Sequence, residues 1–170
     1  MISKKMLQWI IGVVLVMWLL VGCGAVSVKP QPGATFTGPL ELIHSGTNGK
    51  VNSGELEITI AEDGTGIASV SFTLSNMNCS NESGSINITS DGWSTTTTFT
   101  QPAAIANGKF ELDIGGIDEE IKIDGLFTSP TEANATIQIS TTTTVAPPGT
   151  SFRESISCDY GLWKWSGEVK

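Results

Sequence analysis

Beyond residue 35, apolar residues alternate with hydroxyl and charged residues along most of the chain, with a period of two. The segment 68–74 reads Ala-Ser-Val-Ser-Phe-Thr-Leu without a break, and the same spacing recurs in 56–60, 110–114 and 121–127. A period of two places every second side chain on one face of a strand, so one face can pack on a core while the other meets water. The pattern predicts an all-β domain.

Further strands are predicted where β-branched and aromatic residues cluster, at 36–44, 86–88, 93–101, 133–145 and 162–169. Among the turn signals between strands, Asn107-Gly108 is the sharpest. Both residues tolerate positive φ, which favours a tight hairpin between 103–106 and 109–114. Roughly eight to ten short strands in one domain predict a single β-sandwich or a flattened, jelly-roll-like barrel.

The chain begins with a segment typical of export. Lys4 and Lys5 precede an apolar stretch from about residue 6 to 21, which ends in Leu20-Val21-Gly22-Cys23. This run resembles the bacterial lipobox, in which a small residue precedes a cysteine that is lipidated once the preceding residues are removed. An uncleaved transmembrane helix is the alternative, but the stretch is shorter than the ~20 residues that span a bilayer.

The lipobox resemblance implies a helical signal peptide over 1–22 and a lipid anchor on Cys23, with acyl chains such as palmitate. Two or more chains hold a protein on a membrane essentially irreversibly. The residues after Cys23 include Pro30, Pro32 and Gly33, which are typical of a semi-extended tether. We therefore expect a signal peptide over 1–22, a lipidated tether over 23–34 and a β-sandwich domain over 35–170.

The chain is acidic, with 17 Asp and Glu against nine Lys and Arg, and a net charge of −8. Every acidic residue follows Cys23. Nucleic acid and anionic lipid both require clustered basic residues, so the charge argues against either as an electrostatic partner. Membrane contact is expected through the anchor alone, with the domain outside the cytoplasm, on the cell surface or the outer membrane.

Two cysteines remain once Cys23 is assigned to the lipid. Cys79 and Cys158 form an even pair in a domain expected to reach an oxidising compartment, which predicts a disulfide bond. A metal site is the rival interpretation, but neither cysteine has a second Cys or a His at ligand spacing. A redox-active pair would more usually be Cys-x-x-Cys.

The domain also resembles a group of exported bacterial β-sandwich domains that share a pattern of the kind G-x-F-x-S-x-x-x-A-x-G-x-(I/L), followed by C-x-x-G-x-x-x-W-x-A. The resemblance runs over nearly all of 35–170. It is carried by Phe36-Thr37-Gly38, Asn107-Gly108-Lys109-Phe110, Ile123-Asp124-Gly125-Leu126-Phe127 and Cys158-x-x-Gly161-x-Trp163-x-Trp165. Asn134-Ala135 departs from it, where the pattern has a small residue followed by Gly. Because the shared residues are glycine, phenylalanine and tryptophan at strand positions, the resemblance implies architecture and a disulfide rather than an activity.

Catalytic constellations are scarce in the sequence. The one histidine, His44, lies at a predicted strand end, and no serine occupies a G-x-S-x-G context. A pair of carboxylates would suffice for a glycosidase, so an envelope hydrolase stays open as a distant alternative. We predict no catalytic residue and no enzymatic activity.

One acidic run offers ligands of the kind that Ca²⁺ prefers. Asp118-Glu119-Glu120 is flanked by Asp113 and Asp124, but it lacks the spacing of an EF-hand loop. A solvated turn between two strands explains the run equally well and is the simpler interpretation. We predict no metal site and no cofactor.

Aromatic residues could form a sugar-binding face, because exposed Trp and Tyr stack on pyranose rings. Trp163 and Trp165 share a strand face with Gly167 and Val169, which favours a core role. That leaves Trp93 and Tyr160 as candidate ligand-binding residues.

The sequence therefore predicts a lipid-anchored envelope lipoprotein with a non-catalytic binding or structural domain. A carbohydrate-binding module is the first alternative, and an envelope component or a glycan is the expected partner.

Overall fold

A computed structural model describes residues 28–116, 118–146 and 153–170. The predicted signal peptide and Cys23 lie outside the described residues. In the part of the chain that is described, no helix is long and apolar enough to cross a bilayer. The described strands are β1 (Thr35–His44), β2 (Gly49–Lys50), β3 (Ser53–Ile60), β4 (Gly66–Ser80), β5 (Asn87–Ala104), β6 (Lys109–Gly115), β7 (Glu119–Ser129), β8 (Glu132–Val145) and β9 (Glu154–Val169).

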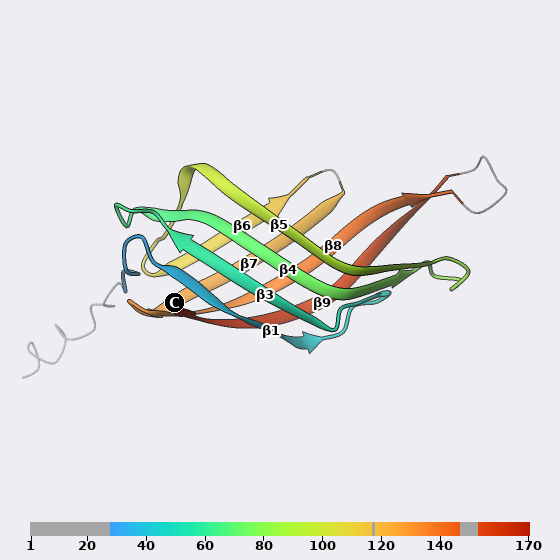
Figure 1. Cartoon of the computed structure of the whole chain (residues 1–170), viewed down its shortest axis with the longest axis horizontal. Helices are drawn as coiled ribbons and strands as arrows, with labels where there is room; N and C mark the ends of the chain where they lie inside the picture. The colour runs from blue at the N-terminus through green and yellow to red at the C-terminus, as the bar shows by residue number, and fades with distance from the viewer. Residues whose placement is uncertain (1–27, 117, 147–152) are drawn as a thin grey trace, which may run out of the picture.

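All of these strands belong to one antiparallel sheet, which confirms the all-β prediction. The strand order is β5-β4-β3-β1-β9-β8-β7-β6, and the short β2 pairs with the end of β4 beyond β3. The sheet bends over on itself, so that β6, β7 and β8 lie behind β3, β4 and β5 (Figure 1). The two layers of the sandwich are thus halves of a single sheet.

The sheet does not close into a barrel, because β5 and β6 pair with different neighbours. The predicted turn is present, with φ of 54° at Asn107 and 78° at Gly108. A single bridge between Ala106 and Lys109 follows, and β6 then pairs with β7 while β5 pairs with β4. The predicted tight hairpin is therefore confirmed at the turn, where Ala106 and Lys109 exchange backbone hydrogen bonds, but the strands do not pair beyond it. The apolar face of β6 meets the core from the opposite layer, so the two strands diverge after the turn.

The core lies between the two layers. Phe36 of β1 and Phe127 of β7 are not neighbours in the sheet, yet their ring centroids are 5.1 Å apart. Trp163 and Trp165 are 2% and 1% exposed, as the strand period predicts. No buried polar or charged residue occurs in the described ranges, which means that burial on the inner faces is apolar throughout.

Two glycines make room for aromatic residues of the resemblance pattern. Gly125 lies directly opposite Phe110 in the β6–β7 ladder, and a Cβ at Gly125 would fall 2.0 Å from Cζ of that ring. A Cβ at Gly167 would fall 2.0 Å from Cζ2 of Trp165. The rings lie over bare backbone, so these glycines are packing residues.

The predicted disulfide is present. Cys79 of β4 and Cys158 of β9 are bonded, with their Cα atoms 5.8 Å apart. The two strands are not ladder neighbours. The bond therefore ties one layer of the sandwich to the other.

Candidate functional site

Two long hairpins extend at one end of the molecule, opposite the end where β9 finishes (Figure 1). One is formed by β4 and β5 and the other by β8 and β9. We call this the open end. A cavity of about 440 Å³ lies there, within the size range of small-molecule sites. We name it the Trp93–Tyr160 pocket, and it is lined by Met77, Ile88, Ser90, Trp93, Asp118, Glu119, Thr141, Thr142, Thr143, Thr144 and Tyr160.

Trp93 forms one wall of the pocket. It lies opposite Leu74 in the β4–β5 ladder, and directly opposed residues share a face, so its ring is on the inner side of the sheet. Because β5 is an edge strand, the ring is only half-buried. Its Nε1 donates a hydrogen bond to Oε1 of Glu119 at 3.1 Å, which joins β5 to β7 across the open edge.

Tyr160 lies on β9 and is 5% exposed. Every fully buried side-chain nitrogen or oxygen in the described ranges has a hydrogen-bond partner, and no hydrogen bond found there involves the Tyr160 hydroxyl. Tyr160 is also among the residues that line the pocket.

The backbone around Tyr160 is held in place on two sides. A Cβ at Gly49 would fall 2.6 Å from Cδ1 of the Tyr160 ring, so the ring packs against the bare backbone of β2. Gly161 has a φ of 91°, a conformation that other residues rarely adopt. Asn48 donates from Nδ2 to the Ser157 carbonyl at 2.6 Å, and its Oδ1 accepts from the Asp159 amide at 3.0 Å. With the disulfide nearby, these contacts preorganise the tyrosine wall.

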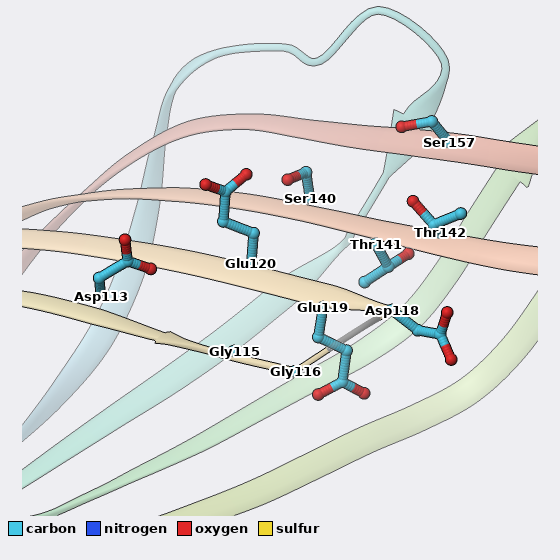
Figure 2. Close-up of a pocket in the computed structure, with 10 residues that line it drawn as sticks. All are labelled: Asp113, Gly115, Gly116, Asp118, Glu119, Glu120, Ser140, Thr141, Thr142 and Ser157. Atoms are coloured by element: carbon cyan, nitrogen blue, oxygen red, sulfur yellow. The ribbon is translucent and has the colours of Figure 1, made fainter.

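Carboxylates line the wall formed by β7. Glu119 is two residues from the buried Ile121 in β7, so both side chains lie on the same face of the strand. The Glu119 side chain is therefore directed inward, toward Trp93. Glu120 points to the outer face, where it pairs with Lys122 at 2.7 Å. Figure 2 shows the same alternation: the side chains of Glu119 and Thr141 point to the side opposite those of Glu120 and Ser140.

An acidic hollow of about 410 Å³ adjoins the pocket on the outer side and is the cavity drawn in Figure 2. It shares Asp118, Glu119, Thr141 and Thr142 with the Trp93–Tyr160 pocket. The run 118–120, expected to be a turn, is partly strand, because β7 begins at Glu119. Among the described residues, no three His, Cys, Asp or Glu side chains are grouped to hold a metal ion.

The structure brings together the two aromatic residues singled out from the sequence, Trp93 and Tyr160, although they are far apart in the chain. The exposed His44 lies at the end of β1 and is not among the residues that line the pocket. Sequence reasoning missed Glu119 as an inward-facing residue. Its spacing of two residues from Ile121 is a signal that would have found it.

Comparison with protein-family models, with curated proteins and with solved structures finds no match for this chain.

Proposed function

We propose that this protein is a lipid-anchored lipoprotein of the bacterial cell envelope whose β domain binds a ligand at the Trp93–Tyr160 pocket without catalysing a reaction. The lipobox resemblance at Cys23 supports the anchor. The resemblance to exported β-sandwich domains supports the location outside the cytoplasm. The observation that carries the binding function is the convergence of a half-buried Trp and a buried Tyr in one cavity that Ser and Thr residues also line.

The position of the pocket supports presentation away from a membrane. Near the start of the described chain, the Gln31 amide donates to the Pro130 carbonyl, in the turn between β7 and β8. The pocket residues of β8 lie toward the other end of that strand. At about 3.3 Å per residue, Thr143 is roughly 35 Å from Glu132. A domain tethered through its N-terminal side would thus direct the open end outward.

A carbohydrate is the ligand class that the lining supports best. The half-buried indole of Trp93 offers an apolar face for stacking, and hydroxyl groups of Ser90, Tyr160 and residues 141–144 offer donors and acceptors. Sugar rings present the same combination of an apolar face and a hydroxyl rim. An apolar metabolite would leave these hydroxyl groups without partners, which costs binding free energy.

One experiment tests both parts of the proposal. The full chain is expressed with radiolabelled palmitate in a bacterial host, and a glycan array is then probed with the purified protein. Cys23→Ala should carry no label and should no longer be found in the membrane fraction. The Cys79→Ala/Cys158→Ala variant should be labelled and should stay in the membrane fraction. Trp93→Ala should lose the glycan signal, whereas the control Leu42→Ala, at an exposed apolar residue of β1, should retain it.

Membrane retention of Cys23→Ala would contradict the anchor and favour an uncleaved apolar segment. A glycan signal that survives Trp93→Ala unchanged would contradict binding at this pocket. Failure of the wild-type chain to bind any glycan would leave the anchor standing and remove the carbohydrate assignment.

A further inference from the structure

The Trp93–Tyr160 pocket carries negative charge that no side chain in the described ranges neutralises. Asp118 and Glu119 both line it, and none of its lining residues is Lys, Arg or His. The salt bridges found in the described ranges join Lys122 to Glu120, Lys164 to Glu41 and Lys170 to Glu57, and all lie outside the pocket. A ligand that enters the pocket therefore meets two carboxylates without a cationic partner.

Glu119 is placed to receive a cation beside an aromatic ring. Its Oε1 accepts the hydrogen bond from Trp93 Nε1, which orients the carboxylate against the indole. No hydrogen bond or salt bridge in the described part of the chain occupies its second oxygen. A protonated amine at this oxygen would gain a charge-assisted hydrogen bond beside the indole.

The second feature is the Tyr160 hydroxyl, which is independent of the acidic residues. The residue is 5% exposed, and its hydroxyl has no partner within the described residues. Tyr160 also lines the pocket, so its hydroxyl group adds a polar group to the residues around the cavity. Its oxygen accepts from an ammonium or a sugar hydroxyl equally well.

We propose that the Trp93–Tyr160 pocket binds a sugar that bears a free, protonated amine, with Glu119 as the counter-charge and Trp93 as the stacking platform. The inference rests on the proposed binding function and narrows its ligand class. At about 440 Å³ the cavity accommodates one or two sugar rings.

The test compares two tetrasaccharides that differ only at nitrogen. Glucosamine tetrasaccharide carries the ammonium groups, and the N-acetylglucosamine tetrasaccharide carries neutral amides on the same backbone. Binding of each to the full-length chain in detergent micelles is measured by calorimetry near pH 6. We expect the amine form to bind about tenfold tighter, the ratio that corresponds to ~1.4 kcal/mol for a hydrogen bond to a charged group.

Two variants test whether the preference for the amine depends on the charge of Glu119 in the pocket or on the net charge of the domain. Glu119→Gln keeps an acceptor for Trp93 Nε1 and removes the charge, so the preference for the amine should disappear. Glu120→Gln removes the same charge one residue away, on the outer face, and should leave the preference intact. A Glu120→Gln effect as large as that of Glu119→Gln would mean that net charge, rather than the pocket, attracts the ligand, and would overturn the inference.

The remaining outcomes are also decisive. Equal binding of both tetrasaccharides that is lost in Trp93→Ala would overturn the amine inference and leave the proposed carbohydrate function standing. Absence of binding by the glucosamine tetrasaccharide would overturn the inference, and the glycan array would then decide the proposed function separately. If n-butylamine bound as tightly as the glucosamine tetrasaccharide, the amine would be recognised without its sugar, and the assignment to a sugar would fail.

Discussion

Removing the disulfide should cost a large part of the stability of the domain, about a third or more, while leaving its folded structure in place. Cys79 and Cys158 are 79 residues apart in the chain, so the bond closes a long loop in the unfolded state. In the chain-entropy model a loop of this length restricts the unfolded ensemble by about 15 cal/mol/K, or ~4.5 kcal/mol at 25 °C. Single domains unfold with about 5–15 kcal/mol, so a loss of this size leaves little margin.

The folded state should survive because other contacts join the same segments. The Asn48 side chain donates to the Ser80 carbonyl at 3.1 Å and to the Ser157 carbonyl at 2.6 Å, which links β4 to β9 beside the disulfide. Cys79 and Cys158 are each 1% exposed, so alanine at both positions also removes buried sulfur from the core. That loss adds to the entropic cost rather than offsetting it.

The measurement is urea unfolding of the oxidised wild type and of Cys79→Ala/Cys158→Ala, followed by far-UV circular dichroism. We expect the free energy of unfolding to fall by about 5 kcal/mol and the denaturant slope to rise, because an uncrosslinked chain exposes more surface when unfolded. Wild type in reductant is the control; it keeps both sulfur atoms and should show the rise in slope with the entropic part of the loss, ~4.5 kcal/mol. A loss below about 1 kcal/mol with an unchanged slope would refute the unfolded-state argument.

Two further predictions concern packing and pH. Gly167→Ala places a Cβ 2.0 Å from Cζ2 of the buried Trp165 ring, so thermal unfolding should show a loss of stability of about 1–3 kcal/mol. Gly92→Ala is the control: its Cβ meets only an ordinary contact at 3.5 Å, so the stability of the domain should change little. Hydrogen bonds from the Thr65 amide and hydroxyl lower the pKa of the exposed Asp63 carboxyl, so the turn gains stability above the unfolded-state pKa and loses it as the pH falls through the folded-state value. Carboxyl NMR titration should find the Asp63 pKa below 3.8 in the wild type and closer to 3.8 in Thr65→Val; equal values in the two proteins would contradict the role of the hydroxyl.

Much of the fold could be predicted because strand periodicity is local. The alternation in 68–74 identifies which side chains of β4 face the core, and burial of Val70, Phe72 and Leu74 confirms it. The positive φ of Asn107 and Gly108 likewise follows from two adjacent residue types. The turn residues do not indicate that β5 and β6 pair with different strands, because strand pairing depends on residues far away in the chain.

The candidate site was predictable only in pieces. Trp93 could be chosen from its position in a polar strand, but its neighbours could not. Glu119 joins it across the edge between β5 and β7, and Tyr160 joins it from β9, because a single sheet folds back on itself. No local pattern encodes that fold-back.

The amino-acid sequence by itself determined the inner and outer face of the strands with clear alternation, and it predicted the pairing of Cys79 with Cys158. Both follow from the two-residue period of a strand and from the number of cysteines left for the domain. Only the tertiary structure decided that the sheet stays open between β5 and β6 and that a half-buried indole, a buried tyrosine and the Glu119 carboxylate share one cavity. These depend on strand order, which is set by contacts between distant residues through the balance of core burial and chain entropy.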